Sequence, residues 1–186
     1  MKKVLLGLVI VLGMAWAIGS YSTQAERLSM QRKDKIYNEI MQQDFEYDYP
    51  TSATDVVKMY CEIEALVYST KFEGKREGRL EELVSKQLEL LDDELISFNG
   101  GKTKIILSTK EDSKKFLESG FKIMEVKYQT SPEVDVDENG NQIKFVKVIE
   151  YVSVGENAYK VYALRRDENK RWKIITYGKT EPFTIS

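Results

Sequence analysis

The sequence predicts an α+β domain in which helices pack on a curved, antiparallel, four-stranded meander. Four runs rich in β-branched and aromatic residues follow one another in the C-terminal half, over residues 121–130, 143–154, 158–166 and 171–177. Before Gly120 the apolar spacing is mainly that of helices. Helices in one half of the sequence and strands in the other are typical of α+β folds rather than of alternating α/β folds.

The connections between the four predicted strands carry turn chemistry. Residues 137–141 read Asp-Glu-Asn-Gly-Asn, and Asn-Gly supplies the positive φ angles of a tight hairpin. Polar clusters at residues 155–157 and 167–170 separate the remaining strands. Short connections of this kind join neighbouring antiparallel strands, which gives the meander.

Two helices are predicted ahead of the sheet. Residues 52–55 have the form of a capping box, with Asp55 in place of the usual Glu, and a helix is expected from there to about residue 69. Its apolar stripe consists of Val56, Tyr60, Ile63 and Val67. A second amphipathic helix is predicted over residues 77–95.

Two shorter elements are predicted before the meander. The apolar triplet at residues 105–107 indicates a short strand. A second capping box begins at Thr109 and predicts a short helix that buries Phe116 and Leu117. This helix is expected to stop at Gly120.

The second predicted strand is apolar on both of its sides. One parity consists of Ile143, Phe145, Ile149 and Tyr151, and the other of Val146, Val148, Val152 and Val154. A sheet with one face in water would alternate cleanly between apolar and polar residues. We therefore expect the helices to cover one face, and a second copy or the chain's own curl to cover the other.

The N-terminal segment predicts a membrane helix. Lys2 and Lys3 precede an apolar run over residues 4–18, and the apolar character continues to residue 21. We interpret this segment as an uncleaved signal anchor that contacts the membrane through residues 4–21. The alternative is a cleaved signal peptide, which would lead to secretion.

Three regions follow from this interpretation. Residues 1–22 are the signal anchor or transmembrane segment, residues 23–49 a stalk or linker helix, and residues 50–186 the α+β domain. The charged segment before the apolar run is very short, and a long following domain translocates largely regardless of its charge. We therefore expect a single-pass protein of the cell membrane with the domain outside the cytoplasm.

The order of elements from about residue 50 to residue 182 resembles the cone-shaped fold of nuclear transport factor 2 and the steroid isomerases, also called cystatin-like. The whole chain, with its single membrane segment and Tyr49-Pro50-Thr51 before the first helix, resembles an uncharacterised family of small membrane-anchored proteins from clostridia-type bacteria. That resemblance implies no known activity. Cone domains on a single anchor act as interaction scaffolds in conjugation machines and in some penicillin-binding proteins.

The composition argues against several classes of function. A net charge of -2 leaves no excess of Lys and Arg to neutralise nucleic-acid phosphates, so no nucleic-acid partner is expected. The sequence has no histidine, the usual general base and the commonest transition-metal ligand. Cys61 is the only cysteine, which excludes an intramolecular disulfide, and a buried, inert thiol is the expected state.

Residues 135–140 match the first half of a calcium-binding loop of the D-x-D-x-N-G type. The second half fails, because Val146 stands where a bidentate Glu is needed and Gln142 occupies a position that is usually apolar. A polar hairpin connection explains the same residues. We predict no metal site and no cofactor.

The resemblance to cone-fold enzymes implies a pocket with an acidic base and a polar partner such as Tyr. The candidate lining residues are Tyr60, Tyr68, Tyr128, Tyr151, Tyr162, Tyr177 and Trp172. Glu62 or Glu64 is the candidate acid. Glu125 and Glu150 also lie on apolar strand faces, and neighbouring Lys residues can pair with both. Aromatic side chains are also the normal filler of a half-buried sheet. Packing is therefore the favoured interpretation, and no catalytic residue is predicted.

The sequence thus predicts a non-enzymatic, membrane-tethered interaction or scaffold domain with a protein partner or self-association. The alternative is a cone domain that binds a small ligand and is at most weakly enzymatic. A pocket open to solvent with a polar group at its base would favour the alternative. A pocket plugged by apolar side chains, with an apolar patch outside, would favour the scaffold.

Overall fold

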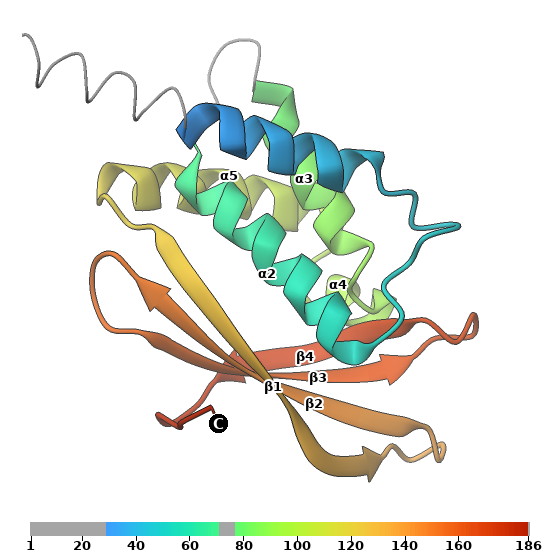
Figure 1. The fold of residues 1–186 in the computed structure, drawn as a ribbon. Helices are drawn as coiled ribbons and strands as arrows, with labels where there is room; N and C mark the ends of the chain where they lie inside the picture. Colours follow the sequence, from blue (N-terminus) through green and yellow to red (C-terminus); the bar gives the residue numbers. More distant parts are fainter. Residues whose placement is uncertain (1–28, 71–76, 186) are drawn as a thin grey trace, which may run out of the picture. The chain divides into compact units, whose positions relative to one another are not determined.

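The computed structural model describes residues 29–70 and 77–185 of the chain (Figure 1). The chain divides into two units, residues 1–39 and residues 40–186. The segment expected to anchor the protein lies outside the described residues. Among the residues that are described, no helix is both long enough and apolar enough to cross a membrane. A helix spans residues 29–42, within the range predicted as a stalk.

The second unit is built on one antiparallel sheet with the strand order β1-β2-β3-β4. The strands are β1 (Ile123–Val136), β2 (Gln142–Val152), β3 (Ala158–Arg166) and β4 (Trp172–Lys179). The predicted meander is therefore confirmed. β1 continues beyond residue 130 and past Pro132, with a register irregularity between Thr130 and Val134. Proline is tolerated there because β1 is an edge strand.

Helices cover one face of this curved sheet (Figure 1). They are α2 (Ala53–Ser69), α3 (Glu77–Leu88), α4 (Asp93–Phe98) and α5 (Lys102–Glu118). The α2 helix packs directly on β1, β2 and β4, and it also contacts α3 and α5. The predicted start of α2 is confirmed, because the Ser52 hydroxyl accepts a hydrogen bond from the Asp55 N–H at 3.1 Å. The fully buried core includes Val56, Ile63, Leu83, Val148, Leu164 and Ile174.

The helix predicted over residues 77–95 is wrong, because the structure divides it. The first part ends at Leu88, and the chain then runs along the outer edge of β4. The Ile174 N–H donates to the Leu90 carbonyl at 3.0 Å, and the Asp92 N–H donates to the Ile174 carbonyl at 2.9 Å. Asp92 then caps α4 through its carboxylate. Pairing with the free strand edge satisfies backbone groups that would otherwise stay unpaired.

The strand predicted at residues 105–107 is also wrong. These residues lie inside α5, which begins at Lys102 directly after Gly101. Gly101 has φ +87°, a conformation that suits glycine and separates α5 from α4. A short apolar triplet cannot distinguish a strand from part of a helix, and here the long helical context prevails. Thr109 therefore lies within α5 and does not cap a new helix.

The burial predicted for the end of α5 is wrong as well. Phe116 is 37% exposed, and Leu117 is only partly buried. The buried residue of α5 is Ser113, whose hydroxyl donates to the Val67 carbonyl of α2 at 2.8 Å. The helix does end where predicted, just before Gly120.

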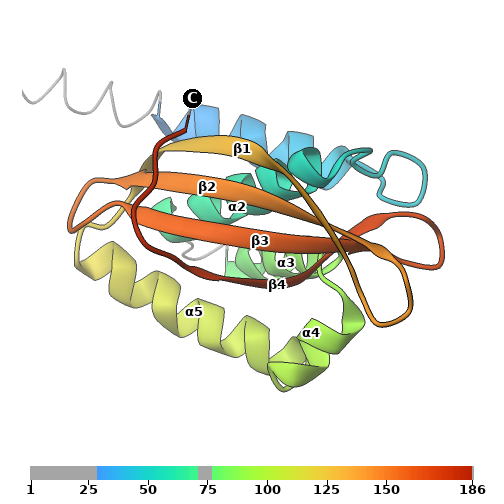
Figure 2. The same cartoon turned by 90° about the horizontal axis from the view of Figure 1, so that it is seen from below.

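The two faces of the sheet are covered by different parts of the chain. On the helix side, Val146 and Val148 are completely buried. On the opposite face the segment after β4 turns back and crosses the strands (Figure 2). There the Thr180 N–H donates to the Tyr159 carbonyl, and the Phe183 ring lies 5.5 Å from the Tyr159 ring, edge to face. The chain itself therefore covers part of the face for which a second copy was one expected partner.

Candidate functional site

A cavity of about 440 Å³ lies between α2, α5 and the end of β4. Its wall includes Tyr60, Glu64, Tyr68, Gln87, Asp112 and Tyr177. Three of these residues recur every four positions on α2, at 60, 64 and 68, which places them on one face of the helix. The same face of α2 thus supplies two aromatic rings and one carboxylate to the cavity.

A buried ionic cluster lies at the base of this cavity. The Lys160 ammonium of β3 is 2.7 Å from a Glu150 carboxylate oxygen and 3.3 Å from both Glu64 oxygens. The exposed fractions of these side chains are 13% for Lys160, 14% for Glu64 and 4% for Glu150. Hydrogen bonds therefore accompany each buried charge, as the low-dielectric interior requires.

The cluster contains two carboxylates and one ammonium, so its protonation depends on how the charges are balanced. Burial raises the pKa of Glu64 to about 7; Lys160 opposes this shift and Glu150 adds to it. Burial alone would lower the pKa of Lys160, but the two carboxylates outweigh it and the net shift is upward. Lys160 is therefore charged at neutral pH, where Glu64 is partly protonated.

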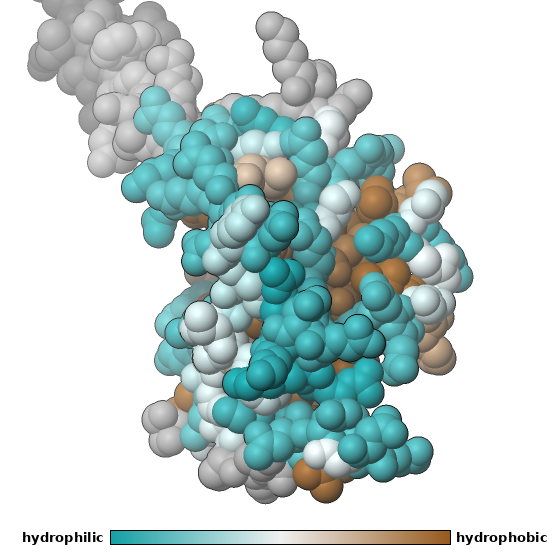
Figure 3. All heavy atoms as spheres, turned by 90° about the vertical axis from the view of Figure 1, so that its right-hand side faces the viewer, coloured by the Kyte–Doolittle hydropathy of each residue, from teal (hydrophilic) through white to brown (hydrophobic). Residues whose placement is uncertain are grey.

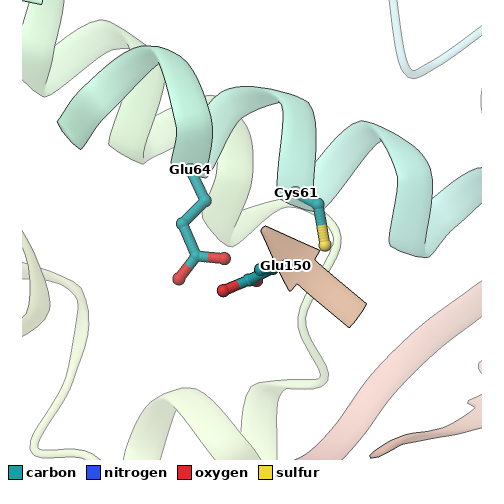
Figure 4. Close-up of side chains that lie close together, drawn as sticks. All are labelled: Cys61, Glu64 and Glu150. Atoms are coloured by element: carbon teal, nitrogen blue, oxygen red, sulfur yellow. The ribbon is translucent and has the colours of Figure 1, made fainter. Parts of the chain in front are cut away.

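Cys61 and Glu64 project from neighbouring turns of α2 toward Glu150 of β2 (Figure 4). One ligand-type atom of each residue lies within 4.8 Å of the others, which is the spacing of a small cation site. Two observations oppose a metal ion here. The Lys160 ammonium already binds both carboxylates, and burial raises the pKa of the Cys61 thiol, so that the thiolate ligand is disfavoured.

Cys61 is completely buried, as expected for an inert thiol. Its sulfur donates a hydrogen bond to the Tyr162 hydroxyl at 3.7 Å. On the cavity side, the Tyr162 ring stacks on Tyr177 with the ring centroids 5.2 Å apart. The Tyr60 hydroxyl donates to that of Tyr177 at 3.2 Å. These rings join the buried cluster to the cavity mouth, where Tyr177 is 42% exposed.

The structure brings only some of the predicted lining residues to this site. Tyr60, Tyr68 and Tyr177 line the cavity. Tyr162 lies behind Tyr177 and is fully buried, and Tyr128 of β1 hydrogen-bonds with Cys61. These two residues support the site without lining it.

Two predicted lining residues lie elsewhere. Tyr151 has the parity of Ile149 and stands on the sheet face opposite the helices, where Lys127 lies 5.2 Å from its ring. Trp172 begins β4 at the other end of the sheet, and its carbonyl accepts a hydrogen bond from the Tyr49 hydroxyl. Val148 has the parity that faces the helices, and Tyr151 has the other. Because both parities of this strand are apolar, the sequence alone could not make this distinction.

Sequence reasoning missed Gln87, Asp112 and the link between Glu64 and Lys160. Gln87 donates its side-chain N–H to the Tyr60 carbonyl at 3.1 Å. This hydrogen bond links α3 to α2 in the cavity wall. The four-residue spacing of Tyr60, Glu64 and Tyr68 could have predicted from the sequence that they share one face of a helix. Glu64 and Lys160 are 96 positions apart, so no local pattern indicates their contact.

The half-formed calcium motif serves as a hairpin turn. The Asp137 carboxylate accepts hydrogen bonds from the N–H groups of Asn139 and Asn141, and from the Asn141 side chain. The Asn141 side chain is the largest cause that holds the pKa of Asp137 below its ordinary value. Arg165 adds a contact at 3.4 Å and also pairs with Asp92. The turn interpretation accounts for these residues.

A second concavity, of about 680 Å³, surrounds Arg165 near α4. In its wall, Arg165 already pairs with Asp92 and Glu94, and it also contacts Asp137 of the neighbouring turn. The cavity beside Glu64 is therefore the stronger candidate for a binding site.

The fold and this site define an α+β protein with an internal ionic cluster beside a polar, aromatic-lined cavity. Residues 1–177 match the family described as Domain of unknown function (DUF6715), and the chain belongs to that family. No curated protein matches the chain. The expected membership of an uncharacterised family is confirmed at this level.

Proposed function

We propose that this domain is a non-enzymatic binding module that takes a small ligand in the cavity between α2, α5 and β4. One observation carries the proposal: Glu64, a mostly buried carboxylate, lines a cavity of about 440 Å³. Small-molecule sites have volumes of roughly 300–1,000 Å³ and contain a few polar groups placed among apolar and aromatic ones. Of the two functions expected from the sequence, this arrangement favours the ligand-binding cone.

The same residues argue against catalysis. Both Glu64 oxygens already accept hydrogen bonds from Lys160, so a proton taken up by this carboxylate competes with an ion pair. The Cys61 thiol is buried behind Tyr162, and its raised pKa keeps it protonated. Activated nucleophiles have lowered pKa values instead.

The proposal includes the nuclear transport factor 2-like cone as the architecture and a membrane tether as its setting. The order of helices before a curved meander supports the cone. The apolar run over residues 4–21 supports the tether and a location outside the cytoplasm.

To test ligand binding, we would block the cavity from its α5 wall. Ser108 is exposed on α5 and lines the cavity, so a Ser108→Trp side chain is expected to fill it without disturbing the core. Fragments found by ligand-observed NMR with the full chain should lose at least tenfold in affinity for this variant. Lys114→Trp, on the same helix but away from the cavity, should retain them.

Two results would oppose ligand binding in this cavity. One is a set of fragments that bind Ser108→Trp and the unsubstituted chain equally well. The other is a screen at millimolar concentration that yields no fragment at all.

A protein-contact role is the second candidate. Exposed apolar side chains lie on α4 and α5, namely Phe98, Leu107 and Phe116, with exposed fractions of 89%, 56% and 37%. Brown, apolar atoms gather along one side of the face drawn in Figure 3, while most of that face is hydrophilic. Exposed apolar patches mark interaction sites. We expect sedimentation of the full chain to show self-association that Phe98→Ser weakens, and a monomer at all concentrations would oppose self-association.

A further inference from the structure

The ionic cluster beside the cavity contains two acidic groups and one basic group. Glu64 and Glu150 share one ammonium, that of Lys160, at 3.3 and 2.7 Å. Asp112 is the other acidic residue of the cavity wall, and it lies 3.4 Å from Lys115 in an exposed pair. The buried cluster thus has one more acidic than basic group, and Glu64 is the member that reaches the cavity wall.

We propose that the ligand of this cavity carries a positively charged nitrogen, as a small alkylammonium ion does, and that Glu64 binds it. This inference rests on the proposed ligand-binding function. With a cation beside Glu64, each carboxylate has its own positive partner: the ligand for Glu64 and Lys160 for Glu150. Lys160 does not have to be displaced. Buried charges are tolerated when each has a partner and hydrogen bonds.

The aromatic wall suits the same class of ligand. Tyr60, Tyr68 and Tyr177 line the cavity around Glu64, and the faces of such rings attract organic cations. Phe98 lies at the rim with most of its ring exposed, so it can contact an apolar chain attached to the nitrogen.

An anionic ligand fits this wall poorly. It would meet Glu64 and Asp112, and Lys104 is the basic residue that could oppose them. The Lys104 stem lies against the turn at Gly100, since a Cβ built on that glycine would lie 2.5 Å from its Cδ atom. Lys104 thus lies toward the α4–α5 turn. A bare metal ion fits less well than an ammonium group, because it would need the position that Lys160 occupies between the carboxylates.

The titration of Glu64 gives the proposal a measurable signature. Its pKa of about 7 means that a proton supplies the missing positive charge at low pH. A bound cation would replace that proton, so binding should release it and should strengthen as the pH rises through 7. Below the pKa the affinity should fall about tenfold for each pH unit, and above it the affinity should level off.

Several titratable groups face Glu64 from the elements packed around it. The charged neighbours are Lys160 of β3, Glu150 of β2 and Asp112 of α5. The others are the amide of Gln87 of α3, the hydroxyl of Tyr177 of β4 and four groups whose pKa values burial raises, namely Tyr60, Cys61, Tyr68 and Tyr162. The four groups with raised pKa values stay uncharged between pH 6 and 8.

The test uses three probes with one carbon skeleton: butylammonium, 1-butanol and butyrate. Calorimetry with the full chain should show that butylammonium binds, about tenfold more tightly at pH 8 than at pH 6. The observed binding enthalpy should change with the ionisation enthalpy of the buffer, because the buffer takes up the proton that Glu64 releases. Glu64→Gln should weaken this binding at least tenfold at pH 8 and remove its pH dependence. Glu62→Gln, the same change at a neighbouring exposed position of α2, should alter neither.

The outcomes separate this inference from the proposed function. If butanol or butyrate binds better than butylammonium and Ser108→Trp blocks that binding, the cavity binds ligands and the cation inference is wrong. No butylammonium binding up to 50 mM, or binding that Ser108→Trp leaves unchanged, also overturns the inference. The fragment screen then decides on the proposed function independently.

Discussion

Replacing Lys160 with methionine is expected to lower the free energy of unfolding by about 3–5 kcal/mol. Lys160 is the ammonium between Glu64 and Glu150, and all three side chains are mostly buried. Methionine keeps much of the side-chain volume but leaves two carboxylates facing one another in a poorly solvated place. Removing one partner of a buried ion pair costs more than the pair itself contributes, because the remaining charge loses its compensation.

Urea unfolding at pH 7 measures this loss. Lys179→Met is the matched control. Lys179 lies opposite Lys160 in the β3–β4 strand register, but its side chain is exposed. It should change stability by less than about 0.5 kcal/mol. Adding Glu150→Gln to Lys160→Met should recover part of the loss, since only one carboxylate then remains. A loss below about 1 kcal/mol for Lys160→Met would contradict the account of the cluster as buried and coupled.

Replacing Val148 with glutamate is expected to prevent folding at room temperature. Val148 lies in the middle of β2, is completely buried and faces α2 across the core. A third carboxylate there would lose its hydration beside Lys160, its cross-strand neighbour, which already pairs with Glu64 and Glu150. Burying it costs several kcal/mol, a large share of the total stability of about 5–15 kcal/mol of a domain. Circular dichroism and the dispersion of NMR signals measure the outcome.

Lys147→Glu is the control for this prediction, because it places the same side chain at the neighbouring position on the opposite face. Lys147 is half-buried there, and its ammonium lies 5.7 Å from the centre of the Phe183 ring. Losing that contact should cost on the order of 1 kcal/mol. A folded Val148→Glu with ordinary thermal stability would contradict the assignment of the two faces.

The meander was predictable from the sequence because neighbouring residues form its turns and strands that follow one another in the chain pair with one another. Asn139 and Gly140 form a turn that Asp137 holds with its own carboxylate, and each strand pairs with the next one along the chain. The prediction failed where contacts between residues far apart in the sequence determine the secondary structure. The helix predicted to residue 95 stops at Leu88, because the following backbone pairs with Ile174, which no local pattern reveals.

The candidate site shows the same division. The spacing of Tyr60, Glu64 and Tyr68 on α2 is a local pattern and indicates one face of a helix. The partner of Glu64 is not local, since Lys160 lies on the third strand. Trp172 was assigned to the pocket as an aromatic strand residue, but the direction of the meander carries it to the far end of the sheet.

The residues that line the cavity are spread over the sequence from Tyr60 to Tyr177. They are therefore synthesised at different times. A ribosome delivers α2 long before β4, so the growing chain carries Tyr60 and Glu64 without the strands that bury them. The sheet can assemble quickly once its hairpins exist, because neighbouring strands pair with short loops. The cavity wall is therefore complete only once the last strand is in place. Chains released by premature termination before β4 lack the Tyr177 part of that wall.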